Sequence, residues 1–150
     1  MITDPHRNCP VLRAGTPVKD AVGAVILLHG RGGSAADILS LAQEFYFPNL
    51  AYLAPEASGN SWYPFSFLAP IEKNEPWLTS ALGKILAAIQ SVGDAGIPAE
   101  RVIVCGFSQG ACLATEYIAR HPKRYAGLIA FTGGLIGPPD ANLSHAGDLA

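Results

Sequence analysis

A serine between two glycines stands where the chain changes from a strand-like to a helix-like pattern. The segment Gly106-Phe107-Ser108-Gln109-Gly110 has the form G-x-S-x-G and follows the β-branched run 102–104, with Cys105 between them. Three continuous β-branched residues predict a strand that is covered on both faces. Small and apolar residues at helical spacing from 109 to about 120 predict a helix. Together these patterns predict a sharp strand-to-helix turn, in which the glycines avoid side-chain clashes.

Such a turn has a chemical use for Ser108. At a cramped bend the serine hydroxyl is lifted clear of the backbone, where it can attack a substrate carbonyl. We therefore interpret Ser108 as a catalytic nucleophile. The alternative is an ordinary turn that contains a serine, because Gly makes up 16 of the 150 residues and the bare pattern is not specific. The strand before Ser108 and the helix after it favour the catalytic interpretation.

Strand-like and helix-like segments alternate along the whole chain. The expected strands are 11–14, 25–28, 50–54, 102–107 and 128–131, and the expected helices are 35–44, 75–92 and 109–120. This alternation is typical of an α/β fold, in which helices flank a mostly parallel sheet. No linker or repeat divides the chain, so residues 1–150 are expected to form a single domain.

The helix expected over 75–92 has the clearest periodicity. Leu78, Leu82, Ile85, Leu86 and Ile89 fall on one face at helical spacing. Asn74 is placed to cap its N-terminus, and Pro76 is tolerated in the first turn. Gly93 is expected to end the helix in a left-handed conformation.

Composition and charge exclude several functions. The net charge is -2 and the basic residues are scattered, so we expect no nucleic-acid partner. The first residues lack the apolar core of a secretion signal, and the longest aliphatic run, 24–28, is far too short to span a bilayer. Three cysteines without metal-ligand spacing indicate a reducing compartment, with Cys105 and Cys112 as small buried hydrophobes. We therefore expect a cytoplasmic protein without a bound metal.

A second glycine-rich segment, His29-Gly30-Arg31-Gly32-Gly33, follows the expected strand 25–28. A loop at this place can expose backbone N–H groups to the oxyanion that forms when a serine attacks a carbonyl. The N–H groups of Arg31 and Gln109 are the expected donors. The alternative is a plain glycine-rich turn or an anion site at a helix N-terminus, without the lysine of a P-loop. We interpret His29 as a residue that orders this loop by hydrogen bonding, and not as the catalytic base.

An aromatic stretch over 61–68 shows neither helical nor alternating periodicity, so we expect a loop. Pockets of open α/β folds form beyond the carboxyl ends of the strands, where such a loop could hold an acyl or aromatic group. Trp62, Tyr63 and Phe65 are the candidate substrate-binding residues, whereas Phe67 is expected in the core. The alternative, that these rings simply close the core beneath the loop, is equally consistent with the sequence.

Three motifs in this order carry a family resemblance. They are His29-Gly30-Arg31-Gly32-Gly33, Gly59-Asn60-Ser61-Trp62-Tyr63-Pro64 and Gly106-Phe107-Ser108-Gln109-Gly110-Ala111. Nearly the whole chain resembles the carboxylesterase/phospholipase family of α/β-hydrolases, which includes the acyl-protein thioesterases. The resemblance implies hydrolysis of small-molecule carboxylic esters or thioesters through an acyl-enzyme, without metal or organic cofactor. It assigns the nucleophile to Ser108, the oxyanion hole to the Arg31 and Gln109 backbone, and a place near the substrate to Trp62.

The family takes its acid and its histidine from loops after later strands, and this sequence reaches Ala150 before either. We therefore expect a single, incomplete α/β-hydrolase domain, truncated before the last strands and nearly inactive alone. Asp140 and His145 have the right chain order for a triad but lie in a proline- and glycine-marked loop with nothing to hold them. His6 and His121 are weaker candidates for the base, and His121 is expected to cap the helix that ends near 120.

Two functional interpretations remain open. The first is the amino-terminal part of a serine esterase, and the second is a short, non-catalytic module that binds acyl ligands or partners. In either case residues 128–131 would form an exposed apolar edge that favours pairing with another chain. The expected partner there is a carboxyl-terminal segment or a second copy of the chain.

Overall fold

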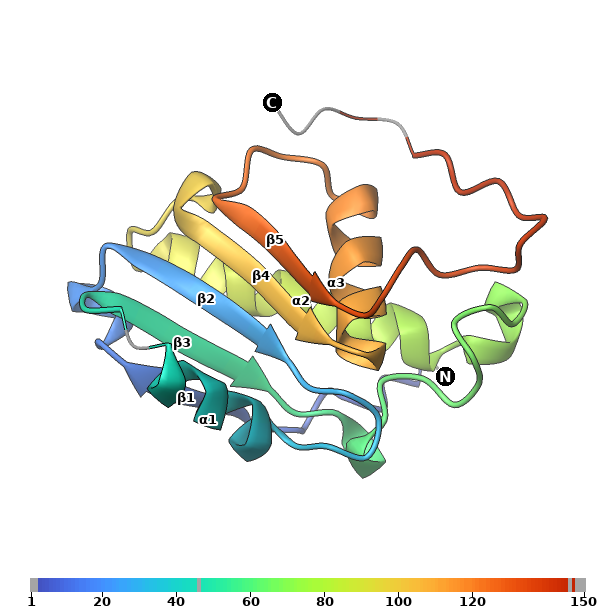
Figure 1. The fold of residues 1–150 in the computed structure, drawn as a ribbon, viewed down its shortest axis with the longest axis horizontal. Helices are drawn as coiled ribbons and strands as arrows, with labels where there is room; N and C mark the ends of the chain where they lie inside the picture. Colours follow the sequence, from blue (N-terminus) through green and yellow to red (C-terminus); the bar gives the residue numbers. More distant parts are fainter. Residues whose placement is uncertain (1–2, 46, 146, 148–150) are drawn as a thin grey trace.

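The computed structural model describes residues 3–45, 47–145 and 147. A five-stranded sheet has the order β1-β3-β2-β4-β5 (Figure 1). The strands are β1 (Val11–Gly15), β2 (Gly23–Leu28), β3 (Leu50–Pro55), β4 (Val102–Phe107) and β5 (Gly127–Phe131). β1 pairs antiparallel with β3, and the other neighbours are parallel. The predicted strands and the mostly parallel sheet are confirmed, and the carboxyl ends of the four parallel strands meet at one edge.

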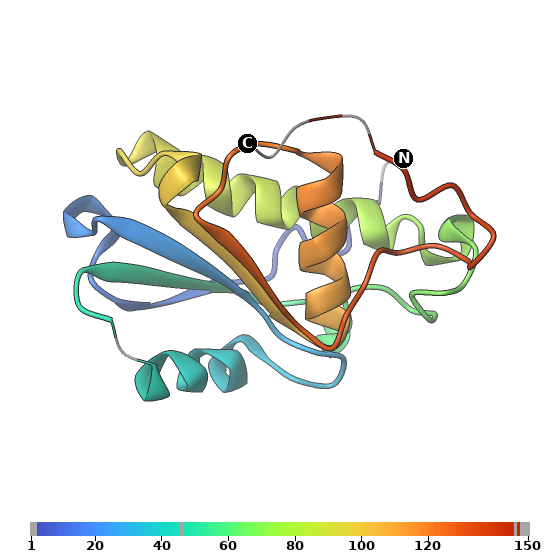
Figure 2. The same cartoon turned by 45° about the horizontal axis from the view of Figure 1, so that its top comes forward.

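Helices lie on both faces of the sheet. α1 (Ala35–Glu44) lies on one face, whereas α2 (Trp77–Asp94) and α3 (Gln109–Arg120) lie on the other (Figure 2). Short 3-10 turns occupy Val18–Asp20, Ser58–Asn60, Ile71–Asn74 and Ala99–Arg101. β2 is buried over its whole length, because it lies inside the sheet with helices on both sides. This explains why its sequence is a continuous apolar run.

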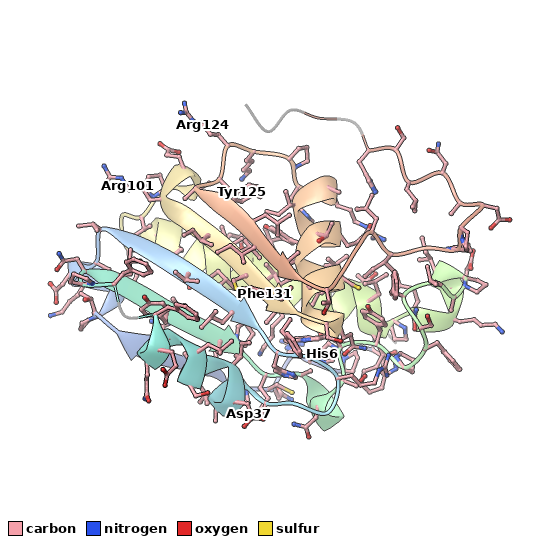
Figure 3. The ribbon with its side chains drawn as sticks, viewed as in Figure 1. His6, Asp37, Arg101, Arg124, Tyr125 and Phe131 are labelled. Carbon is pink, nitrogen blue, oxygen red and sulfur yellow. The ribbon has the colours of Figure 1, made fainter. Side chains whose placement is uncertain are left out.

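The face that carries α1 is only partly covered. α1 packs on the part of the sheet formed by β1, β3 and β2, with Ile38 and Ala42 buried in this contact. Beside it an open, apolar cavity of about 790 Å³ extends across β4 to β5. On β5, Ile129 is 42% exposed and Phe131, labelled in Figure 3, is 48% exposed. β5 is the edge strand of the sheet. The predicted exposed apolar edge is therefore confirmed.

The start of α2 differs from the prediction. Asn74 ends a 3-10 turn, and its side chain accepts from Phe65 N–H at 2.8 Å and donates to the Ser66 carbonyl at 3.1 Å. It therefore does not cap the helix, which begins at Trp77. The Glu75 carboxylate takes over this role, because it accepts from Thr79 N–H at 3.0 Å.

The end of α2 also differs from the prediction. Gly93 is an ordinary helical residue, and the helix continues to Asp94. The glycine with a left-handed backbone is Gly96, with φ of 102°. Within the described residues, no helix combines the length and the apolar character needed to cross a membrane.

Candidate active site

Ser108 occupies the predicted turn between β4 and α3 with a strained backbone. Its φ is 55° and its ψ is -115°, a conformation that costs a non-glycine residue about 1–3 kcal/mol. Two neighbours hold it there, because Ser108 N–H donates to the Phe131 carbonyl at 2.9 Å and Ala111 N–H donates to the Ser108 carbonyl at 2.9 Å. The residue is exposed. No hydrogen bond between described residues involves the Ser108 hydroxyl, which is therefore accessible from solvent.

Crowding explains the two glycines of the motif. A Cβ on Gly106 would lie 2.2 Å from the Gly110 carbonyl oxygen, and a Cβ on Gly110 would lie 2.2 Å from the Leu28 carbonyl oxygen. Both distances are far below van der Waals contact. The absence of two side chains is what lets the first turn of α3 rest against the ends of β4 and β2.

The His29–Gly33 loop lies directly beside the turn that holds Ser108. A Cβ on Gly30 would lie 3.2 Å from the Phe107 carbonyl oxygen and 3.4 Å from Ser108 Cβ, so the loop passes close to this turn. Gln109 follows Ser108 at the N-terminus of α3, where helix N–H groups have no intrahelical partner. Among the hydrogen bonds between described residues, neither Arg31 N–H nor Gln109 N–H is used as a donor. Both of the N–H groups that the sequence singles out are therefore without an acceptor among the described residues.

His29 orders its loop, and its ring nitrogens are both engaged. Nε2 accepts from Ala57 N–H at 3.1 Å, so the proton is assigned to Nδ1, which donates to the Gly30 carbonyl at 2.8 Å. The ring is buried and stacks on Trp62 with centroids 5.0 Å apart. This arrangement agrees with the sequence interpretation, because neither nitrogen is free to take a proton from Ser108.

The segment 57–63, here called the bridge segment, connects the two candidate donors. On one side the Asn60 carbonyl accepts from Gly32 N–H at 2.8 Å, and Asn60 Nδ2 donates to the Gly33 carbonyl at 2.7 Å. On the other side Trp62 N–H donates to Gln109 Oε1 at 2.8 Å. Gln109 Nε2 returns a bond to the Tyr63 carbonyl at 2.9 Å. Sequence reasoning missed this role, because it depends on contacts between residues far apart in the chain.

The predicted substrate-binding residues divide into two groups. Trp62 and Tyr63 are 0% and 1% exposed, and the Trp62 indole N–H donates to the His29 carbonyl at 2.9 Å. Burial also raises the pKa of the Tyr63 phenol. In this structure both rings belong to the core under the loop, which is the alternative that the sequence left open. Phe65 is 53% exposed, and Phe67 packs partly buried against the core as predicted.

The Arg31 side chain of the His29–Gly33 loop hydrogen-bonds to the exposed part of the aromatic stretch 61–68. The Arg31 guanidinium donates to Ser61 Oγ at 2.9 Å, to the Pro64 carbonyl at 3.0 Å and to the Phe65 carbonyl at 2.8 Å. Arg31, whose backbone N–H is one of the two candidate oxyanion donors, thus also fixes the loop that carries Phe65.

None of the other histidines assembles with Ser108. His121 Nδ1 faces the Tyr117 carbonyl at 3.2 Å, which confirms its predicted capping position. His145 Nε2 lies 3.7 Å from a carboxylate oxygen of Glu116, and no hydrogen bond joins it to Ser108. Asp140 is exposed. Over the described ranges, no group of three or more His, Cys, Asp or Glu side chains could hold a metal ion.

Comparisons with known proteins identify the family of the chain. The sequence model of the phospholipase/carboxylesterase family matches residues 11–147. Acyl-protein thioesterase 1 of Yarrowia lipolytica is 27% identical over 135 residues, which are 78% of this chain and 60% of the relative. Acyl-protein thioesterase 1 of Saccharomyces cerevisiae is 29% identical over 143 residues, which are 81% of this chain and 62% of the relative. The chain thus spans about 60% of the length of these curated relatives.

Solved structures show the same fold. The crystal structure of a phospholipase/carboxylesterase from Dyadobacter fermentans superposes with a TM-score of 0.90 at 47% sequence identity, over 95% of this chain and 68% of that one. This similarity confirms the predicted α/β-hydrolase fold. With the family model matching most of its residues, the chain belongs to the phospholipase/carboxylesterase family.

Proposed function

We propose that this chain carries the nucleophile and the oxyanion hole of a serine hydrolase for carboxylic esters or thioesters. One observation carries the proposal: an exposed, backbone-strained Ser108 with unused N–H groups of Arg31 and Gln109 on the two segments beside it. Strain of this kind persists where the surrounding structure fixes it, and it concentrates at functional sites. The names of the relatives, acyl-protein thioesterase and phospholipase/carboxylesterase, support the substrate class.

The proposed reaction has two steps. Ser108 Oγ attacks the substrate carbonyl carbon, its proton passes to a base, and the charge on the carbonyl oxygen is stabilised by the Arg31 and Gln109 N–H groups. Collapse of the tetrahedral intermediate expels the alcohol or thiol, which takes up the proton, and leaves an acyl group on Ser108. Water then attacks the acyl-enzyme by the same route and regenerates the hydroxyl.

None of the four histidines of the chain, all of which the structure describes, is placed to serve as the base for this reaction. All four histidines are placed by the structure: His6 and His29 are buried with both ring nitrogens bonded, and His121 and His145 face groups of α3. A serine hydroxyl without a base is a poor nucleophile at neutral pH. We therefore propose that the chain by itself is nearly inactive, as one incomplete domain of a cytoplasmic enzyme.

Chemical rescue tests the proposal on the chain itself. A fluorophosphonate probe should label the chain slowly, and added imidazole should accelerate the labelling by supplying the missing base. Ser108→Ala should abolish both reactions, with Ser66→Ala as the control for an exposed serine elsewhere. Labelling that survives Ser108→Ala would contradict the nucleophile. Fast labelling without imidazole would show that a base already lies within the chain.

The apolar cavity beside α1 favours a second candidate, binding of acyl ligands without catalysis. The cavity reaches the site, because Gly30, Arg31 and Phe107 line it together with the open face of β5. In this case a fatty-acyl ligand would bind saturably to the chain and equally to Ser108→Ala. Imidazole would then not accelerate fluorophosphonate labelling.

A further inference from the structure

We propose that His6 is a positioning residue for the oxyanion hole: its neutral ring clamps both ends of the bridge segment, and acid releases this clamp. The proposal rests on the function proposed for Ser108. His6 lies near the carboxyl ends of the strands (Figure 3), and it comes from the residues that precede β1. It belongs to neither glycine motif, so nothing in the local sequence connects it with the site.

The contacts of His6 bracket the bridge segment. Nδ1 accepts from Ser58 N–H at 3.0 Å, which assigns the ring proton to Nε2. Nε2 faces the Trp62 carbonyl at 2.9 Å and therefore donates to it. The ring is 0% exposed and lies edge-on between Trp62 and Trp77, at centroid distances of 5.4 and 5.6 Å. Only the neutral ring can make both hydrogen bonds, because a protonated imidazole has no acceptor for Ser58 N–H.

The bridge segment passes this constraint on to the two candidate donors. Asn60, between the two clamped residues, bonds Gly32 and Gly33 of the loop that contains Arg31. Trp62, one of the clamped residues, donates its N–H to the Gln109 side chain. A shift of the bridge segment would therefore move both N–H groups relative to Ser108. Misplacement of reacting groups by about 1 Å can cost about 100-fold in rate.

The surroundings of His6 favour its neutral form. Burial lowers the pKa of the ring, and the charge of Lys84 on α2 and the neighbouring His29 at the end of β2 act in the same direction. The hydrogen bond with the Trp62 carbonyl and the carboxylate of Asp4 oppose this shift, and Asp4 is itself held by Ser80 Oγ. The lowered pKa means that the unfolded chain binds the proton more readily than the folded chain. Stability from this group is therefore present above its usual pKa and is lost as the pH falls through the lowered value.

The simplest alternative is that His6 only fills space between two tryptophans. A spacer would not need an acceptor nitrogen, and its protonation would not be felt at Gly32. Substitutions can separate the two roles. His6→Asn keeps an acceptor near the Nδ1 position and cannot titrate, whereas His6→Ala removes both hydrogen bonds. His121→Asn is the matched control, because His121 follows the far end of α3 and its ring faces the Tyr117 carbonyl, with no hydrogen bond to the bridge segment among the described residues.

The first arm of the experiment measures a conformational change of the bridge segment and does not depend on catalysis. The amide NMR shifts of Ser58 and Gly32 are recorded in the chain between pH 8 and pH 4, together with tryptophan fluorescence, which a protonated imidazole quenches. We expect one shared acid transition at both amides in the native chain and in His121→Asn, and none in His6→Asn. A transition that persists in His6→Asn, or a Gly32 amide that stays fixed while Ser58 titrates, would overturn the proposal.

The second arm measures positioning at one pH. At pH 8 the imidazole-assisted labelling of Ser108 should fall roughly tenfold in His6→Ala, less than the 100- to 1,000-fold typical of losing an oxyanion donor outright. We expect His6→Asn to recover part of this loss, because it retains the acceptor. Equal rates in His6→Ala and the native chain would overturn the positioning role. If the native chain is never labelled, the proposed function fails, while the amide transition still decides whether His6 clamps the bridge segment.

Discussion

Gly110→Ala is the substitution for which the structure gives the most definite expectation. The added Cβ would lie 2.2 Å from the Leu28 carbonyl oxygen and 2.5 Å from the His29 carbonyl oxygen, both of which are backbone atoms. Ordinary contact begins at 3.4 Å, so the start of α3 and the end of β2 must separate by roughly 1.2 Å. No side chain can rotate away to relieve the clash, because both neighbours belong to the backbone.

The size of the effect follows from two opposing terms. Alanine favours a helix over glycine by about 1 kcal/mol, whereas overpacking of a closed site costs typically 1–3 kcal/mol and occasionally more. Because two carbonyls resist the methyl group, we expect the upper part of this range and a net loss of about 2 kcal/mol. Gly83→Ala is the matched control, since Gly83 is an exposed residue inside α2 with no atom within 4 Å of its added Cβ. It should stabilise the chain by about 0.5–1 kcal/mol.

Urea unfolding and probe labelling measure the two consequences. With a slope near 2 kcal/mol per molar urea, the loss should lower the unfolding midpoint of Gly110→Ala by about 1 M. Imidazole-assisted labelling of Ser108 should fall by about 100-fold, because Gln109 N–H moves away from the His29–Gly33 loop. An unfolding midpoint equal to that of the native chain, or a labelling rate equal to that of Gly83→Ala, would refute the argument from crowding.

Three further predictions concern other parts of the fold. The Glu116 carboxylate accepts from the buried Ile136 N–H at 2.8 Å, and Glu116→Ala removes this acceptor. The free energy of unfolding should fall by about 1–3 kcal/mol, and the Ile136 amide should exchange its hydrogen faster. Glu116→Gln should restore protection of this amide. Cys9 is half-buried, whereas Cys105 is buried and its burial raises the pKa of its thiol. A maleimide should therefore label Cys9 first, which peptide mass can follow. Equal labelling rates would contradict the burial of Cys105. We expect the open apolar face to cause self-association. Ile129→Lys places a charge on this face and should raise the monomer fraction measured by sedimentation; an unchanged monomer fraction would contradict this expectation.

Local patterns in the sequence were sufficient to predict the fold. The strands and helices follow from the apolar runs and from helical spacing, and the turn at Ser108 follows from five consecutive residues. The predicted cap of α2 was wrong because two neighbouring residues, Asn74 and Glu75, can each cap the N-terminus of this helix. Asn74 has the side chain of a good cap, but Phe65 and Ser66 engage it, and Glu75 takes its place. Such competition is decided by a loop about ten residues away, which a local pattern does not describe.

The support of the site could not be predicted from the sequence, because it is built from distant contacts. His6 meets Trp62 across 56 residues, and Trp62 meets Gln109 across 47 residues. The burial of Trp62 and Tyr63 has the same origin, since an aromatic ring in an irregular segment can face a pocket or the core equally well. A sequence pattern can therefore identify the serine and its glycine loops, whereas only the three-dimensional structure shows what keeps them in register.

The bond from Ser108 N–H to the Phe131 carbonyl gives β5 a part in holding the proposed nucleophile. Strand β4 and helix α3 meet at the serine, but the unfavourable torsion angle of Ser108 is also anchored from β5, the neighbouring strand. A nascent chain that has not yet added β5 lacks this anchor, and its serine can relax into an ordinary turn. Reactivity would then appear only after the edge strand has joined the sheet, which ties the onset of nucleophilicity to a late step of assembly.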